Sequence, residues 1–232
     1  MLNDNAEPQC EGESMTAKAY KGLGMEGPVA RWYAKTTRKD LGEFQALAQR
    51  MAEDLPVDAR VLEVAPGPGY LSIELAKRGR RSVTGLDISK TFVEIARRNA
   101  EKEGVQVDFQ LGNASRMPFE DASFDLIVCR AAFKNFSAPV AALREMRRVL
   151  RPGGKAMVID LRKDAPLEAI DAYVAKMHTN AVNATIIRWT FRLMLLKRAY
   201  TESDFRSFIS ESGFEKYDMQ EAPLGLEIAL FK

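Results

Sequence analysis

Cysteine and histidine are scarce in this chain of 232 residues, which contains two cysteines and a single histidine. Cys10 and Cys129 cannot build a disulfide framework of the kind that small secreted proteins use. The cysteines and the histidine also lack the spacing of a metal site, which needs clusters of cysteine, histidine and carboxylate side chains. The sequence therefore predicts a protein without a disulfide framework and without a bound metal.

Long apolar runs and an excess of one charge are also absent. No window approaches the roughly 18–20 consecutive apolar residues of a membrane span, and the N-terminus lacks the basic-then-apolar order of a signal peptide. These absences predict a cytoplasmic protein without a membrane span. Lysine and arginine total 34 while aspartate and glutamate total 32, so the net charge is only +2. That balance argues against a nucleic-acid partner, because phosphate backbones attract a clustered basic face.

The hydrophobic pattern divides the chain into a polar start and one domain. Residues 1–26 are predicted to form a flexible tail, and residues 27–232 a single domain that begins with a helical period over residues 27–55. After it, short apolar runs alternate with helical segments, two of which are predicted to begin at Ser89 and Ser137. The runs that predict strands are 60–65, 82–86, 105–111, 124–129 and 155–160. Strands that alternate with helices in this way build a parallel, doubly wound sheet.

The C-terminal part departs from that alternation. A helix is predicted at 201–212, followed by strands at 213–219 and 224–231 that only a short turn separates. So short a link allows an antiparallel pair and excludes a helical crossover. An insertion at about 165–200 is mostly apolar and is predicted to form a mobile helical lid. The expected fold is thus α/β, a Rossmann-like, doubly wound, mostly parallel seven-stranded sheet with an antiparallel C-terminal hairpin and a helical lid.

The first predicted strand leads into a glycine-containing turn, residues 63–69, and then into a helix. Glycines after a first strand let the backbone approach a ligand where a side chain would clash. Asp87 ends the second predicted strand, where a carboxylate can accept both hydroxyls of a ribose. Together these features predict a nucleoside-containing cofactor. The alternatives are that Gly67 and Gly69 form a plain turn and that Asp87 caps the following helix.

Three details favour a cofactor other than NAD. The glycines do not have the spacing G-x-G-x-x-G, and Pro66 and Pro68 stiffen the turn. The acid Glu63 precedes the turn. A carboxylate beside a pyrophosphate is unfavourable, whereas the amino group of S-adenosylmethionine gains from one. Finally, the chain ends in a predicted β-hairpin.

At these residues the sequence resembles the class I S-adenosylmethionine-dependent methyltransferases, in the branch of ubiquinone and menaquinone biosynthesis. The resemblance covers roughly residues 58–160 and extends loosely to the C-terminal hairpin. It rests on six motifs in order, namely Glu63–Gly69, Gly85-Leu86-Asp87, Gly112-Asn113-Ala114, Met117-Pro118-Phe119, Ser123-Phe124-Asp125 and Arg148–Gly154. These motifs are specific for fold and cofactor and nearly silent on the methyl acceptor.

The resemblance implies a role in binding S-adenosylmethionine for each matching residue. Glu63, Gly67 and Gly69 would border the methionine part, and Asp87 would hold the ribose. The other implied contacts are Ile88 on the adenine, Asn113 and Ala114 at the adenine edge, and Arg130 next to the sulfonium.

Three positions depart from the family pattern. Ala65 replaces the first glycine of the loop, a change of one methyl group that narrows the loop. Asn113 replaces the acid beside the adenine amino group, and its side-chain oxygen can still accept that hydrogen bond. Phe133-Lys134 replaces a His-His pair, so any role of such histidines is absent. The alternatives are that Asn113 is an ordinary turn residue and that Arg130 pairs with an acid.

The resemblance implies methyl transfer from S-adenosylmethionine to a small, hydrophobic or aromatic molecule. Because the sulfonium already activates the methyl group, the protein mainly positions an in-line displacement and excludes water. A neutral hydroxyl or amine acceptor also needs a general base, for which Tyr33 and His178 are the candidates; the alternative for His178 is a solvated helix residue. The rival hypotheses are a non-catalytic S-adenosylmethionine-binding regulatory module and an RNA methyltransferase.

The lid and the first helical segment are expected to wall the acceptor pocket, because open α/β sheets bind ligands beyond the carboxyl ends of their strands. The predicted lining side chains are Trp32, Tyr33, Phe133, Trp189, Phe191 and Met194. Core packing of Trp32 and Tyr33, a homodimer interface and a membrane-surface contact are the alternative roles of these apolar segments.

Overall fold

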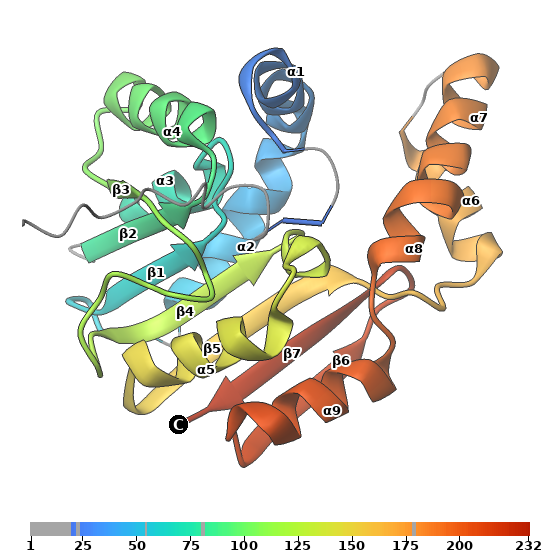
Figure 1. The fold of residues 1–232 in the computed structure, drawn as a ribbon. Helices are drawn as coiled ribbons and strands as arrows, with labels where there is room; N and C mark the ends of the chain where they lie inside the picture. Colours follow the sequence, from blue (N-terminus) through green and yellow to red (C-terminus); the bar gives the residue numbers. More distant parts are fainter. Residues whose placement is uncertain (1–19, 22–23, 54, 80–81, 178–179) are drawn as a thin grey trace, which may run out of the picture.

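The computed structural model describes residues 20–21, 24–53, 55–79, 82–177 and 180–232 (Figure 1). Within these residues seven strands form one sheet with the order β3-β2-β1-β4-β5-β7-β6. The strands are β1 (Arg60–Val64), β2 (Ser82–Asp87), β3 (Asp108–Leu111), β4 (Phe124–Arg130), β5 (Leu150–Leu161), β6 (Lys216–Glu221) and β7 (Gly225–Phe231).

The sheet is parallel except at one edge. β1 to β5 run parallel, and β7 runs antiparallel between β5 and β6. Because these strands are parallel, the carboxyl ends of β1, β2, β4 and β5 lie side by side at the same end of the strands, where open α/β sheets bind ligands. The predicted fold class is confirmed, including the antiparallel C-terminal hairpin.

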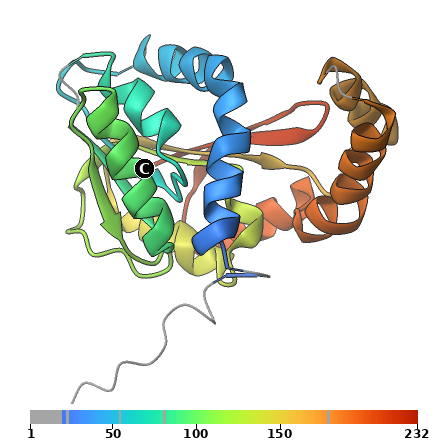
Figure 2. The same ribbon diagram turned by 90° about the horizontal axis from the view of Figure 1, so that it is seen from above.

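Helices cover both faces of the sheet (Figures 1 and 2). The described helices and single turns are α1 (Gly27–Thr37), η1 (Arg38–Asp40), α2 (Leu41–Glu53), α3 (Tyr70–Ala76), α4 (Lys90–Lys102), η2 (Phe133–Asn135), α5 (Pro139–Val149), α6 (Leu167–Lys176), α7 (Ala181–Thr190), η3 (Phe191–Leu195), α8 (Leu196–Arg198) and α9 (Glu202–Ser212). On one face, α2, α3 and α4 bury apolar side chains, and on the other face α5 and α9 do so. In the described ranges, no helix combines the length and the apolar character needed to cross a membrane.

Several predicted boundaries differ from the structure; for example, the strands predicted at 105–111 and 213–219 begin only at Asp108 and Lys216. The helical period over residues 27–55 is two helices, because the turn η1 at Arg38–Asp40 separates α1 from α2. α5 begins at Pro139, whose fixed φ suits the first helical position, so Ser137 does not cap it. β5 begins at Leu150, directly after α5, whereas the sequence pattern places the start of this strand later.

The insertion at 165–200 is helical, as predicted, and is called here the α6–α8 unit. It has a small core of its own, to which Phe191 and Leu196 contribute. An isolated bridge between Arg162, directly after β5, and Tyr200 brings the two ends of the unit together. Figures 1 and 2 both show the unit at one end of the domain, apart from α1.

Part of the segment predicted as a tail, residues 1–26, is described and contacts the domain. Tyr20 forms an isolated antiparallel bridge with Phe136. The Glu26 carboxylate accepts the Lys90 N–H at 2.9 Å, at the start of α4. These described residues therefore belong to the packed domain.

Candidate functional site

The turn between β1 and α3 holds three residues in the left-handed region of the backbone map. Gly67 has a φ of 54° and Gly69 a φ of 80°, and Ala65 lies in the same region with a φ of 57°. A side chain destabilises this conformation by roughly 1–2 kcal/mol, which is why glycine is favoured there. Ala65 thus adopts the backbone conformation that a glycine would adopt at this position, so the path of the loop backbone is unchanged.

Gly69 is also a point of close packing, which gives a stability prediction. A Cβ at Gly69 would lie 2.7 Å from Phe109 Cζ and 2.9 Å from the Ala96 Cβ, whereas a Cβ at Gly67 would meet nothing within 4 Å. We expect Gly69→Ala to lower the free energy of unfolding by about 2–4 kcal/mol, since overpacking adds to backbone strain. The control Gly67→Ala carries only the strain and should lose about 1–2 kcal/mol. Urea unfolding measures both losses, and equal losses would contradict the packing argument.

Asp87 ends β2 beside this turn and is buried. One carboxylate oxygen accepts the Gly67 N–H at 2.9 Å and the other accepts the Ser89 N–H at 2.8 Å. Burial raises the pKa of Asp87 to about 6, although these backbone hydrogen bonds oppose the rise. Each oxygen keeps a further lone pair, so the carboxylate can still accept both hydroxyls of a ribose. The fixed position of Asp87 fits the predicted ribose contact.

Glu63 lies on β1, next to β2, and only 3% of its surface is exposed. Its carboxylate accepts the hydroxyl of Ser72, which belongs to α3. Burial raises the pKa of Glu63 to about 7, against the opposing effects of Ser72 and Arg130. No described cation forms an ion pair with it, and a buried carboxylate without an ion pair fits a cationic group on a ligand. Glu63 and Asp87 therefore fit the amino group and the ribose of S-adenosylmethionine.

Asn113, after β3, forms a turn. Its side-chain oxygen accepts the Ser115 N–H at 2.9 Å, and its backbone carbonyl accepts the Arg116 N–H at 3.0 Å. In this structure Asn113 therefore makes the contacts of an ordinary turn residue, which was the alternative to an adenine contact. The adenine contacts of Asn113, Ala114 and Ile88 stay predictions.

Arg130, at the end of β4, is held by α2. Its guanidinium donates to Glu43 Oε2 at 2.9 Å and lies 4.4 Å from the centroid of the Phe44 ring. Arg130 thus pairs with an acid, which the sequence left open as the alternative to a contact with the sulfonium. The ion pair reduces the repulsion that a free guanidinium would exert on a cationic ligand, and the sulfonium contact stays a prediction.

Tyr33 of α1 and Tyr20 have perturbed hydroxyl groups. The Tyr33 ring packs edge-on against Phe92, with 5.8 Å between the centroids. Burial raises the pKa of Tyr33 while Arg130 opposes the rise, and burial raises the pKa of Tyr20 while Arg198 opposes it. A tyrosine with a raised pKa is neutral near pH 7, so Tyr33 suits hydrogen-bond donation better than proton abstraction. The other candidate base, His178, lies outside the described residues.

The remaining side chains predicted to line the acceptor pocket do not share one environment. Phe133 is completely buried and Phe191 is 9% exposed, whereas Trp32, Trp189 and Met194 are 67%, 63% and 50% exposed. Phe133 lies in an aromatic cluster of the main core, and Phe191 packs inside the α6–α8 unit. Because both rings are already covered, neither presents a surface to an acceptor in this structure.

A buried ion pair that the sequence did not single out lies after β4. Lys134 Nζ is 2.7 Å from Asp160 Oδ1, and the Lys134 N–H donates to Oδ2 at 2.8 Å. Both side chains are at most 5% exposed, and the pair ties the loop after β4 to the end of β5. The available signals were a lysine where the family has a histidine and an aspartate at the end of a predicted strand.

Three of the family motifs stabilise the fold around the loop between β3 and β4. Arg148 donates to the carbonyl oxygens of Met117 at 3.0 Å and of Phe119 at 2.7 Å. Arg151 donates to both oxygens of Asp125, at 2.8 and 2.9 Å. These contacts give the motifs around residues 117–119, 123–125 and 148–154 a structural reason that does not involve the cofactor.

The described part of the chain has a cavity away from the carboxylate site and lacks a metal-binding cluster. A cavity of about 600 Å³ is lined by Ser82, Val83 and Arg97 among others, at the amino end of β2. Asp87 is at the opposite end of that strand, so this cavity is separate from the carboxylate site. The described residues contain no group of three or more histidine, cysteine and acidic side chains that could hold a metal ion.

Comparisons with known proteins agree with this geometry. Residues 61–154 match the family model described as a methyltransferase domain. The chain is 38% identical to a demethylmenaquinone methyltransferase of Deinococcus radiodurans over 44% of this chain and 42% of that protein. It is 28% identical to a ubiquinone/menaquinone biosynthesis C-methyltransferase of Roseobacter denitrificans over 72% of this chain and 70% of that protein. The chain spans about half the length of curated relatives such as the Deinococcus protein.

The fold has a counterpart among solved structures. A Methanococcus maripaludis protein assigned to the S-adenosylmethionine-dependent methyltransferases matches with a TM-score of 0.74, at 23% identity, over 91% of this chain and 95% of that chain. At this identity the likeness shows the fold alone. Residues 61–154 thus match a methyltransferase domain, and by its curated relatives the chain resembles the class I S-adenosylmethionine-dependent methyltransferases, in the branch of ubiquinone and menaquinone biosynthesis.

Proposed function

We propose that this chain transfers the methyl group of S-adenosylmethionine to a small hydrophobic acceptor that carries a hydroxylated aromatic ring. The observation that carries the proposal is the pair of buried carboxylates, Glu63 and Asp87, on neighbouring strands beside the glycine turn. The names of the relatives, which include demethylmenaquinone and ubiquinone biosynthesis methyltransferases, support a quinol as the class of acceptor.

The residues of this chain bind and orient the cofactor. When bound, S-adenosylmethionine supplies a methyl group that its sulfonium already activates for displacement. Glu63 forms an ion pair with the amino group, and Asp87 accepts the ribose hydroxyls. Because both carboxylates are buried, water competes little for these contacts, and each is stronger than it would be at the surface.

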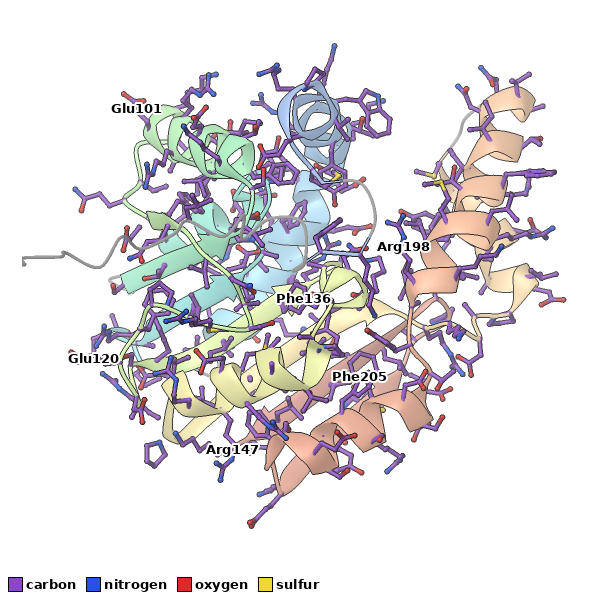
Figure 3. The ribbon with its side chains drawn as sticks, viewed as in Figure 1. Glu101, Glu120, Phe136, Arg147, Arg198 and Phe205 are labelled. Carbon is purple, nitrogen blue, oxygen red and sulfur yellow. The ribbon has the colours of Figure 1, made fainter. Side chains whose placement is uncertain are left out.

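The acceptor binds above the carboxyl ends of β4 and β5, between α1 and the base of the α6–α8 unit. Contacts between separate segments support this location, because Tyr20 bridges to Phe136 in the loop after β4 and Lys21 donates to the Tyr200 hydroxyl. Figure 3 shows Arg198 on the side of α8 that faces the rest of the domain, toward Phe136. Aromatic side chains with polar tips suit a flat, hydroxylated ring.

Tyr33 orients the acceptor by a hydrogen bond. Burial raises the pKa of its hydroxyl, which is therefore neutral near pH 7, so Tyr33 donates to an oxygen of the acceptor ring and does not act as a base. A quinol hydroxyl is a phenol with a pKa of about 10 and stays neutral near pH 7, so its electron-rich ring is the nucleophile. The C–C bond to the ring carbon would form as the bond between sulfur and the methyl group breaks, and the hydrogen of that carbon would then leave as a proton to water.

Methylation assays with a panel of acceptors test this proposal. We expect a naphthoquinol with an unsubstituted ring carbon to be methylated, with S-adenosylhomocysteine formed in equal amount. Tyr33→Phe should lower kcat/KM for the quinol by about tenfold, the effect of one neutral hydrogen bond, and should leave the Kd for S-adenosylmethionine nearly unchanged. Tyr217→Phe is the matched control, since the hydroxyl of Tyr217 on β6 accepts a hydrogen bond from Arg206 of α9, and it should behave as the wild type.

Two outcomes would contradict the proposal. Tight binding of S-adenosylmethionine without turnover on any acceptor of the panel would favour the non-catalytic binding module. Methylation of bulk tRNA in preference to the quinol would favour the RNA methyltransferase.

A further inference from the structure

Helix α7 and the π-helical turn η3 expose a row of large apolar side chains. Val182, Ile186, Trp189 and Leu193 are 70%, 57%, 63% and 47% exposed. Their alternating spacing of four and three residues puts them on one face of a helix. Single exposed apolar side chains are ordinary, whereas a contiguous set marks an interaction surface. These four residues are called the apolar row below.

The apolar row lies on a different face of α7 from the one that packs against the rest of the protein. Ile187, Phe191 and Leu195 pack with α6 inside the α6–α8 unit. Thr185 and Thr190 donate their hydroxyls back to carbonyl oxygens of the same helix, each at 2.9 Å. The helix therefore has one apolar face inside and a second apolar face outside, and these threonine hydroxyls are already satisfied.

The charged residues of α7, η3 and α8 are all basic, whereas the acids Glu168 and Asp171 of the unit lie on α6. From residue 172 to residue 201 the sequence has five lysines and arginines and no aspartate or glutamate. Arg188 pairs with Asp171 at 2.6 Å. Arg192 and Lys197 are exposed and form no ion pair with any residue that the structure describes. Apolar side chains flanked by free cations are typical of helices that lie at the surface of an anionic membrane.

We infer that the apolar row docks on an anionic lipid surface, with Arg192 and Lys197 facing the head groups. A second copy of the chain fits less well, because a two-fold contact would set the same cations against each other. Trp189 suits a membrane interface, since its ring is apolar and its N–H is polar. The docking goes beyond methyl transfer and does not depend on which acceptor is methylated.

Co-sedimentation of the whole chain with vesicles tests the inference. The probes are vesicles of phosphatidylcholine alone and vesicles that contain about one third of phosphatidylglycerol. We expect binding to the anionic vesicles, weakened at least about tenfold both in Ile186→Ser/Trp189→Ser and in Arg192→Glu/Lys197→Glu. Val57→Ser is the matched control, because Val57 is 62% exposed outside the apolar row, and it should bind as the wild type. Circular dichroism checks that the variants keep their helices.

Fluorescence gives a second readout, because the chain has only two tryptophans. In a Trp32→Phe background the emission reports on Trp189, and we expect it to shift to shorter wavelength with anionic vesicles only. Absence of binding to anionic vesicles, or equal binding by the Ile186→Ser/Trp189→Ser variant, would overturn the inference. A dimer that this variant converts to a monomer, without vesicle binding by the wild type, would assign the row to a second copy. A change confined to the KM of the acceptor would assign the row to the acceptor instead.

Discussion

Replacing Asp87 by alanine is expected to weaken the binding of S-adenosylmethionine by about 10- to 150-fold. The ribose hydroxyls lose their charged acceptor, and hydrogen bonds to a charged group contribute roughly 1.5–3 kcal/mol. The variant also leaves the N–H groups of Gly67 and Ser89 without the acceptor that they have now. Isothermal calorimetry measures the change in Kd, and Asp58→Ala, at an exposed carboxylate, should leave it unchanged. An unaltered affinity in Asp87→Ala would refute the ribose contact.

The same carboxylate predicts a pH dependence of cofactor binding. The pKa of Asp87 is raised to about 6 by burial, and only the ionised form can accept both hydroxyls while it holds its backbone donors. Affinity should therefore fall as the pH decreases through about 6. In Asp87→Asn, which does not titrate, the part of this dependence that comes from Asp87 should disappear. A dependence identical in both proteins would show that Asp87 is not its source.

Replacing Glu63 by glutamine is expected to remove the roughly 3 kcal/mol by which the ionised carboxylate destabilises the ligand-free protein at about pH 8. Burial raises the pKa of Glu63 from its ordinary value of 4.5 to about 7, so the folded state holds the proton more tightly than the unfolded state does. The stability contributed by this group is therefore fully present below about pH 4.5 and is lost as the pH rises through about 7. Glutamine keeps an oxygen for the Ser72 hydroxyl and has no charge to bury, so the gain should shrink toward pH 5. At the same time, the variant should bind S-adenosylmethionine more weakly, because its amino group loses the carboxylate.

Urea unfolding at the two pH values measures this effect, and Glu74→Gln provides a control of opposite sign. Glu74 is also buried, but hydrogen bonds from Arg78 and Lys77 outweigh the effect of burial and lower its pKa. Its ionised form is therefore stabilised, and Glu74→Gln should destabilise the protein at about pH 8. A stability change in Glu63→Gln that is the same at both pH values would contradict the raised pKa.

The arrangement of Glu63, Gly67 and Asp87, the candidate cofactor residues, could be predicted from the sequence because these residues lie on elements that follow one another along the chain. Glu63 and Gly67 follow one another along a strand and its turn, and Asp87 stands at the end of the next strand along the chain. In a parallel sheet such strand ends meet at one edge, so the order of the elements already brings these residues together. The contacts of Arg130 and Asn113 were open between two alternatives, since the partner that each residue has in the fold is not visible in its own motif.

The pairs that join distant segments could not be predicted. Lys134 and Asp160 become partners only because β4 lies beside β5, and Tyr20 meets Phe136 only because the described N-terminal residues return to the loop after β4. The boundary between α1 and α2 was not predicted for a related reason. The apolar period of α1 continues into α2, while the turn at Arg38–Asp40 that separates them leaves no strong signal in the composition.

By itself the sequence determined the class of fold, the glycine turn and the carboxylates beside it, because hydrophobic period, turn chemistry and strand order are local properties. Only the tertiary structure decided which aromatic residues are covered. Phe133 and Trp189 stand in similarly apolar stretches, yet one is buried and the other is 63% exposed. The physical reason is that burial depends on what a distant part of the chain places against a side chain. For α7, that partner covers one apolar face and leaves the other open.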